Sequence, residues 1–314
     1  MKAGTAFELL VKNILLHIGF SQVSSDGLYI FDSAPGQMIQ GLGDAHNADV
    51  LLEPPVQTPF YTPTRLLIEC KDYSRPVGLN TLRSALGLRE DINHFDIVNK
   101  DELESRRVNR RRGLIHNHTR YAYQVAVASM SGFTTPAQNF AASHRIPLIE
   151  FHKMPFWNDF CDAVYSQDRH ASFYKVEDEE IESIIHRIAS RCAIAITNLG
   201  QMIFLYQQFG EHVTFSDRYF LRWTSVKDPW TLVTDGAEYQ FQLPEYILKK
   251  WIDSSVTELD KRINAINYKA NFMSHLVVYY CECSMPQMKM ISINRNELEE
   301  ARNNLIGNNF NPLK

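Results

Sequence analysis

The sequence predicts an α/β domain with a mixed sheet flanked by helices, followed by a smaller β-rich α+β domain. Three observations predict this. The chain has 314 residues, which is long for one hydrophobic core and sufficient for two. Strand-length apolar runs alternate with helical patterns up to about residue 160, and strand-like runs dominate after about residue 191. We therefore expect a first domain at 1–160, a connecting helical region at 161–191 and a second domain at 192–314.

The elements of the first domain follow one another in a clear order. Residues 3–18 carry apolar side chains at helical spacing, and Gly19 stands where such a helix would stop. The segment up to about Gly43 is rich in Gly, Ser and Pro and predicts a loop. The expected elements after it are strands at 48–52 and 65–70, a helix at 79–95, a strand at 124–129, a helix at 136–144 and a strand at 147–151. The last strand–helix–strand unit implies a crossover, and hence a mixed sheet covered by helices.

The second half has a different texture. Residues 177–191 begin acidic and end basic, as a helix dipole prefers, and we expect them to form the connecting helix. Six strand-like runs follow, with a helix expected at about 244–269: AIAITN, QMIFLYQQF, YFLRWTSV, TLVTD, EYQFQL and HLVVYYCEC. The sequence leaves recognition, regulation and dimerisation open as roles for this domain.

Composition narrows the class of protein. Hydrophobic content of 45% and charged content of 22% are ordinary for a globular protein. The net charge of −4 argues against a generally basic surface for nucleic acids, but not against a local basic face. Five scattered cysteines predict neither a disulfide framework nor a zinc finger. Glu8 and Lys12 interrupt the apolar N-terminal run, so we expect no signal peptide, no membrane partner and a cytoplasmic location.

An acidic residue on one expected strand and an E-x-K motif on the next carry the chemistry. Glu69 and Lys71 are two residues apart, so their side chains point to the same face, and Asp49 can join them from the neighbouring strand. Converging carboxylates suit Mg²⁺, and a lysine can orient the attacking water or neutralise the transition state. This spacing also occurs by chance on solvated strands. However, the apolar run 66–68 predicts a buried central strand, where such charges are costly unless paired or metal-bound.

Four separated segments resemble the Mrr-like restriction-endonuclease domains of the PD-(D/E)xK nuclease superfamily: AFELLVKNILLHIGF, GDAHNADVLL, IECKDYSRPVGLNTLRSALGLREDI and VASMSGFTTPAQNFAASHRIPLIEF. The resemblance covers about residues 3–151. It implies an endonuclease that hydrolyses DNA phosphodiesters with Mg²⁺, for which Mn²⁺ can substitute, in restriction or anti-phage defence. Many such domains have Gln before x-Lys, whereas this chain has Glu69.

The resemblance also implies a role for each site residue. Asp49 and Glu69 would be metal ligands, the carbonyl of Cys70 the third protein ligand, and Lys71 the catalytic lysine. Glu8 matches an acidic residue of the first helix that often contributes to the metal site in such domains. A glutamate on a helix surface is the other interpretation of Glu8, and the sequence leaves both open.

Two further features are candidates for DNA contact. Residues 106–120 hold six arginines and no acidic residue, in a stretch that is longer than the usual link of the resembled domains. A charge run is usually a solvated face; in a nuclease it can contact phosphates, and we expect this of Arg106, Arg107, Arg110, Arg111 and Arg112. His46 precedes Asp49 by three residues and can contact a phosphate or the attacking water, or cap a loop.

The expected partners follow from these interpretations. DNA is the expected substrate, with RNA less favoured by the resemblance, and a homodimer is expected if both strands are cut. Two alternatives stay open. One is an effector nuclease switched on by a ligand or a partner defence protein bound through the second domain. The other is an inactive nuclease fold that serves as a DNA-binding subunit, which predicts a broken triad, whereas the triad is intact.

Overall fold

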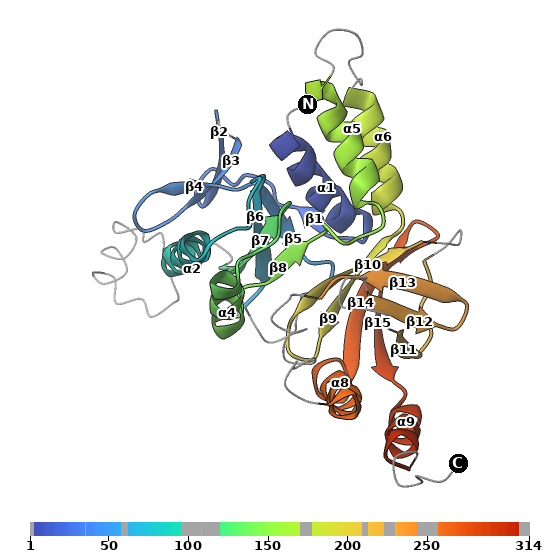
Figure 1. Ribbon diagram of the computed structural model, residues 1–314. Helices are drawn as coiled ribbons and strands as arrows, with labels where there is room; N and C mark the ends of the chain where they lie inside the picture. The colour runs from blue at the N-terminus through green and yellow to red at the C-terminus, as the bar shows by residue number, and fades with distance from the viewer. Residues whose placement is uncertain are drawn as a thin grey trace.

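The structure is a computed structural model that describes residues 3–34, 36–57, 62–95, 108, 120–169, 178–208, 213–222, 230–243 and 257–307. It contains a mixed α/β part and a closed barrel of strands beside it (Figure 1). The expected change along the chain, from a mixed α/β pattern to a β-rich one, is therefore confirmed. Among the described residues, no helix combines the length and the apolar character that crossing a membrane requires.

A five-stranded sheet organises the first part. Its order is β1-β5-β6-β7-β8, with bounds Ser21–Gln22, Val50–Glu53, Thr64–Lys71, Ala122–Ser129 and Leu148–Glu150. The central strand β6 pairs antiparallel with β5 and parallel with β7, and β7 pairs parallel with β8. The sheet is thus mixed, as the sequence predicts, and the E-x-K motif ends its central strand.

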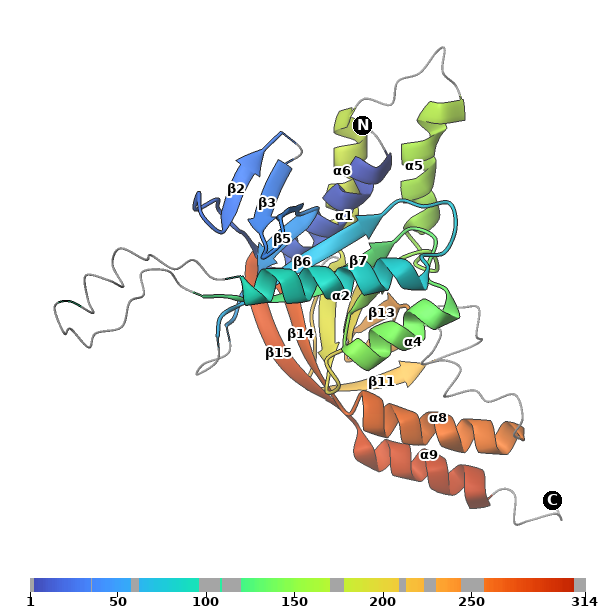
Figure 2. The same ribbon diagram turned by 90° about the vertical axis from the view of Figure 1, so that its left-hand side faces the viewer.

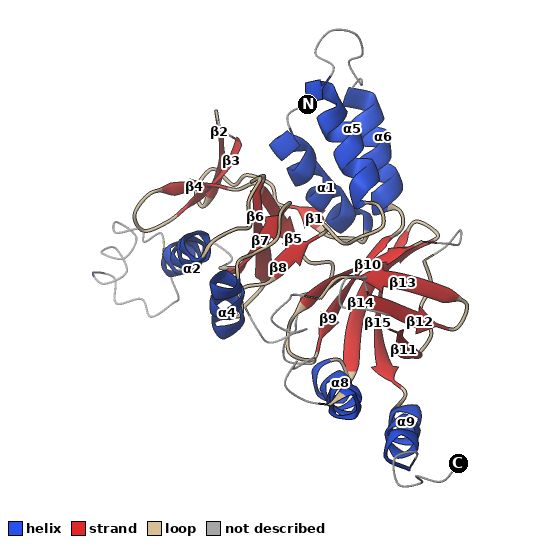
Figure 3. Cartoon of the chain, viewed as in Figure 1, coloured by secondary structure: helices blue, strands red, loops and turns tan. Residues whose placement is uncertain are grey.

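Helices cover both faces of this sheet (Figure 3). The helices α1 (Ala3–His17), α5 (Trp157–Arg169) and α6 (Asp178–Ala189) pack on one face, and α2 (Leu79–His94) and α4 (Thr135–His144) pack on the other. The alternation of side chains along β6 explains the two layers: Ile68 belongs to the core under α1, and Leu67 to the core under α2. The expected stop of the first helix is confirmed, since Gly19 has φ +101°, a conformation that favours glycine.

The segment between α1 and β5 differs from the loop that its composition predicts. It forms β1 and a second, three-stranded sheet of β2 (Ile30–Ser33), β3 (Gly36–Gln40) and β4 (Ala45–Asn47). These strands are short and mostly solvent-facing, so they lack the apolar alternation that predicts a strand. Hydrogen bonds from three backbone amides to Oδ1 of Asp26, those of residues 28–30, lead the chain into β2.

Seven strands of the C-terminal part close into a barrel in the order β10-β13-β12-β11-β15-β14-β9. Their bounds are Cys192–Thr197 (β9), Met202–Gln207 (β10), Arg218–Arg222 (β11), Trp230–Thr234 (β12), Ala237–Phe241 (β13), His275–Glu282 (β14) and Met285–Ile293 (β15). Figure 2 shows α8 (Glu258–Phe272) and α9 (Arg295–Gly307) side by side at one end of the barrel. The sequence did not predict β15 or α9; the part of the expected helix at 244–256 lies outside the described residues.

One apolar core joins the sheet, the helical layer and the barrel. Outward-facing side chains of β9 and β10, among them Ile194 and Phe204, pack in the same core as α1, α5 and α6. The rings of Phe151 and Phe204 meet edge to face, with 5.0 Å between their centroids. The expected boundary at residue 160 lies inside α5. The three-part division of the chain stays a prediction about how its parts fold.

Candidate functional site

The three residues of the expected triad lie around one open hollow. Asp49 directly precedes β5, and Glu69 and Lys71 lie near the end of β6. All three side chains line a hollow on the face of the sheet that α2 covers, and Ser84 and Leu88 of α2 complete its wall. The pairing of β5 with β6 brings together residues that are 20 positions apart in the sequence.

Asp49 is held where the pairing of β5 and β6 ends. The last ladder pair on this side is Val50 with Ile68. One residue further, Oδ2 of Asp49 accepts a hydrogen bond of 2.8 Å from the backbone N–H of Cys70, and Oδ1 accepts one of 3.3 Å from Nδ2 of Asn47. The carboxylate therefore replaces a backbone acceptor and is fixed beside the end of the central strand.

Lys71 and Glu69 form an ion pair, with 2.6 Å between Nζ and Oε2. Burial acts to lower the pKa of Lys71, but the hydrogen bond and charge of Glu69, together with the charge of Asp49, outweigh burial and raise that pKa. Lys71 is thus a charged ammonium at neutral pH.

The charges of the site do not balance. Burial raises the pKa of Asp49, the hydrogen bond from Cys70 lowers it, and the charge of Glu69 raises it again. Two carboxylates share one ammonium, and this surplus of negative charge fits a bound cation. Within the described part of the chain, no group of three or more His, Cys, Asp and Glu side chains is arranged to hold a metal ion by itself. One or two carboxylates with water and substrate phosphate are the usual set for Mg²⁺.

Glu8 approaches the triad from the other layer. It is partly buried on α1 and lines a second hollow together with Lys12, Asn47 and Asp49. Burial raises the pKa of Glu8, and the charge of Asp49 raises it further. Asp49 therefore lies between two hollows, with Glu69 and Lys71 in one and Glu8 in the other.

Cys70 meets the site through its backbone. Its N–H holds Asp49, whereas its side chain packs against the core under α1. Burial raises the pKa of this thiol well above its usual range, and the charges of Asp49 and Glu8 act in the same direction. A neutral thiol is a poor metal ligand, so the carbonyl remains the atom through which Cys70 is expected to bind a metal.

His46 lies in the strand β4 and lines the same hollow as the triad. Its Nε2 is 2.6 Å from Oδ2 of Asp91 on α2. No pattern in the sequence singles out Asp91, because it is separated from His46 by 45 positions and stands on an ordinary amphipathic helix.

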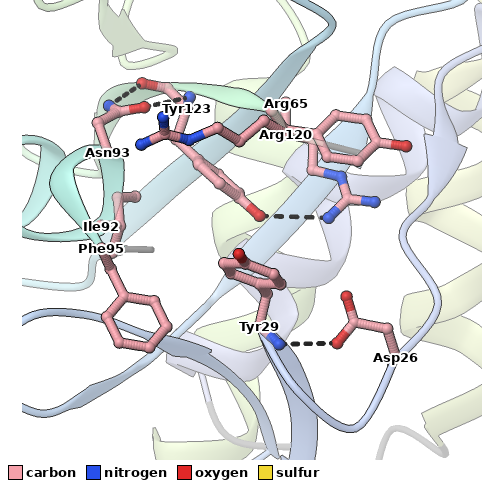
Figure 4. A pocket seen from close by; sticks show the side chains of 9 residues that line it. Asp26, Tyr29, Arg65, Ile92, Asn93, Phe95, Arg120 and Tyr123 are labelled. Atoms are coloured by element: carbon pink, nitrogen blue, oxygen red, sulfur yellow. Dashed lines mark hydrogen bonds between the residues drawn. The ribbon is translucent and has the colours of Figure 1, made fainter. Parts of the chain in front are cut away.

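The arginine cluster Arg106, Arg107, Arg110, Arg111 and Arg112 lies outside the described residues. The residues that flank this stretch, Phe95 and Arg120, both line a small hollow with Arg65 and Tyr123 (Figure 4). In that hollow Nη1 of Arg65 donates a hydrogen bond of 3.2 Å to the hydroxyl of Tyr123. The hollow lies at the amino ends of β6 and β7, whereas the triad lies at the carboxyl end of β6.

Comparisons with known proteins do not identify a function for this site. No family model matches the chain, and no curated protein matches it. Among solved structures, the chain is similar to the crystal structure of AF1548, a protein of unknown function, at 13% sequence identity and a TM-score of 0.32. The match covers 58% of this chain and 78% of that one. A similarity at this level carries no argument about fold or function.

Proposed function

We propose that this chain is a metal-dependent endonuclease whose first part has the PD-(D/E)xK fold of the Mrr-like type. Its substrate is DNA, and the reaction is hydrolysis of phosphodiester bonds with Mg²⁺, for which Mn²⁺ can substitute. The observation that carries the proposal is the shared hollow of Asp49, Glu69 and Lys71 at the end of the central strand. The surplus of negative charge around Asp49 supports it.

Each residue of the hollow has a role in this reaction. Asp49, Glu69 and the carbonyl of Cys70 would hold the metal ion. When bound, Mg²⁺ lowers the pKa of water and stabilises charge on the phosphate. The N–H of Cys70 keeps Asp49 in place, and the ammonium of Lys71 neutralises charge that develops on the phosphate. Glu8 reinforces the negative potential at Asp49 from the second hollow.

The wider function rests on the resemblance to Mrr-like domains and is an inference by analogy. We expect the arginines of 106–112 to contact DNA phosphates, because guanidinium groups position a duplex without reading its sequence. Cleavage of both strands would require a homodimer. Restriction or anti-phage defence is the role that this activity suits.

A second candidate function is an effector nuclease that a ligand or a partner protein switches on through the barrel. The apolar core shared by β10 and α1 favours it. A rearrangement of the barrel can reach α1, and with it Glu8, through packed side chains.

Cleavage by the purified full chain tests the main proposal. Supercoiled and linear DNA, methylated and unmethylated, are incubated with Mg²⁺, with Mn²⁺ or with a chelator. We expect metal-dependent cutting by the wild type and a rate about 10²–10³-fold lower for Lys71→Ala, since an electrostatic group of the transition state is lost. Lys289→Ala is the matched control, because Lys289 also forms an ion pair, 3.0 Å from Asp217, but in the barrel.

The other outcomes are equally informative. Cutting by Lys71→Ala at the wild-type rate would reject the proposed site. Absence of cutting by folded, metal-loaded wild type would leave two interpretations, a gated effector or an inactive DNA-binding subunit. Tight binding to DNA without cleavage would then favour the binding subunit.

A further inference from the structure

A histidine–aspartate pair stands at the edge of the triad's hollow. His46 comes from β4 and Asp91 from α2, the helix that also contributes Ser84 and Leu88 to the wall of the hollow. The short contact of 2.6 Å between Nε2 of His46 and Oδ2 of Asp91 joins the three-stranded sheet to this helix.

The structure holds Asp91 from more than one side. Its Oδ1 accepts a hydrogen bond of 3.2 Å from the backbone N–H of Gly43, in the turn that leads into β4. Gly41 of the same turn lies so close that a Cβ there would stand 2.0 Å from Oδ2 of Asp91. The carboxylate is therefore packed into the turn, and the imidazole of His46 is fixed with it.

This arrangement selects one tautomer of His46. The hydrogen bond from His46 lowers the pKa of Asp91, which is thus a carboxylate and accepts the hydrogen of Nε2. In a neutral imidazole the other nitrogen, Nδ1, then carries a lone pair. Among the residues that the structure describes, none forms a hydrogen bond with Nδ1.

In the proposed function, the triad leaves no group available to take a proton. Lys71 is an ammonium paired with Glu69. Asp49 accepts two hydrogen bonds, and in the proposed function it is a metal ligand together with Glu69. Glu8 lies in the second hollow, on the α1 side. Hydrolysis nevertheless requires that the attacking water lose a proton.

We propose that His46 is the general base of the reaction and that Asp91 is its positioning residue; the inference rests on the proposed nuclease function. The oxygen of water attacks phosphorus, and the proton of that water passes to Nδ1 of His46. The bond from phosphorus to the leaving sugar oxygen breaks, and that oxygen keeps the electron pair and takes a proton from solvent. His46 returns its proton to solvent after each turnover.

Chemical rescue of the cleavage reaction tests the role of His46. We expect His46→Ala to cut DNA about 10²–10⁴-fold more slowly than wild type, the range of general base catalysis. Added imidazole should restore part of this loss, because it can occupy the vacated space and accept the proton. It should not restore Lys71→Ala. His94→Ala is the matched control, since His94 lies on the exposed side of α2, near Glu90, and does not line the hollow.

The tautomer tests the role of Asp91 without any cleavage. In ¹⁵N NMR spectra of the wild type, neutral His46 should carry its hydrogen on Nε2. Asp91→Asn removes the charge that selects this tautomer, so hydrogen on Nδ1 should become populated. The same variant should lower kcat with KM nearly unchanged, because the substrate contacts remain.

Each negative result would contradict a different part of the proposal. Wild-type rates in His46→Ala, or a loss that imidazole does not restore, would overturn the base while cutting by the wild type upholds the nuclease. A tautomer that does not respond to Asp91→Asn would overturn the positioning role. Absence of cutting by the wild type would overturn the main proposed function, a nuclease active by itself, and with it the base role of His46 in that reaction.

Discussion

Asp49 combines a structural role with a proposed chemical role in one side chain. Burial and the charge of Glu69 raise its pKa, although the N–H of Cys70 opposes them. A carboxyl whose pKa is raised on folding holds its proton more tightly in the folded state than in the unfolded chain. Its stabilising contribution is therefore present at low pH and is lost as the pH rises through the raised pKa. At neutral pH the charged form of Asp49 destabilises the fold.

A substitution at this residue should separate stability from function. We expect Asp49→Asn to raise the free energy of unfolding at neutral pH by about 0.5–2 kcal/mol, in the range of many stabilising substitutions, while cleavage is lost. The gain should shrink as the pH falls through the raised pKa of Asp49, because wild-type Asp49 is then neutral as well. Urea unfolding at neutral and acidic pH measures both effects. A variant less stable than the wild type at neutral pH would show that charged Asp49 stabilises the fold instead.

The stabilisation of the folded protein by Mg²⁺ tests the proposed metal site at Asp49. Mg²⁺ that binds the folded state at about 100 times its Kd stabilises a protein by about 2.7 kcal/mol. We expect such a rise in the unfolding free energy of the wild type and none for Asp49→Asn. An equal response of both proteins would place the bound metal elsewhere.

At the scale of elements, the site depends on how a small sheet docks onto α2. Asp91 accepts a hydrogen bond from the backbone N–H of Gly43, in the turn between β3 and β4. Its contact with His46 links α2 to β4 itself. Gly41 makes this approach possible, since a Cβ there would also lie 2.9 Å from the carbonyl oxygen of Asp44. These backbone and side-chain contacts hold the three-stranded sheet in position, although it has few buried apolar residues of its own.

A single methyl group should disturb this docking. We expect Gly41→Ala to lower the stability of the protein by about 1–3 kcal/mol, as overpacking commonly does, and to slow cleavage by displacing His46. Thermal unfolding and the DNA cleavage rate are the measurements. Gly43→Ala is the control, because a Cβ there would meet Oδ1 of Asp91 at an ordinary 3.8 Å. Equal effects of the two substitutions would count against close packing at Gly41.

At the scale of the molecule, the sheet and the barrel do not have separate interiors. The face of the sheet under α1, the helices α5 and α6, and the outer side of β9 and β10 share one apolar core. The inside of the barrel forms a second core, around side chains such as Trp230 and Tyr239. We therefore expect the α/β part and the barrel to unfold together.

Truncation of an aromatic residue between the two parts tests this coupling. Phe204 is buried on β10 and meets Phe151 of the first part edge to face. Phe204→Ala should cost about 3–5 kcal/mol and preserve a single unfolding transition by calorimetry and by fluorescence. Phe220→Ala, on β11, should have a small effect, because that ring is 40% exposed. Two resolved transitions, of which Phe204→Ala shifts the first and leaves the second unchanged, would show that the first part and the barrel unfold independently.

Local sequence patterns were enough to predict the elements with strong apolar periodicity. These are α1, α2, α4 and the strands β5 to β8, because a buried face of a helix or a strand repeats at a fixed spacing. The same spacing rule brought Glu69 and Lys71 to one face. It failed for β2 to β4 and for β15, whose exposed faces carry no such repeat; Met285, Met288 and Met290 of β15 are all exposed.

Several contacts between residues that are far apart in the sequence could be seen only in the tertiary structure. The hydrogen bond of Asp49 to the backbone of Cys70 and the pairing of His46 with Asp91 join different elements. So do the closure of the barrel and its shared core with α1. The physical reason is that apolar spacing is a local property of the chain. Contacts across layers depend instead on how twisted sheets and helices pack, which no single segment encodes.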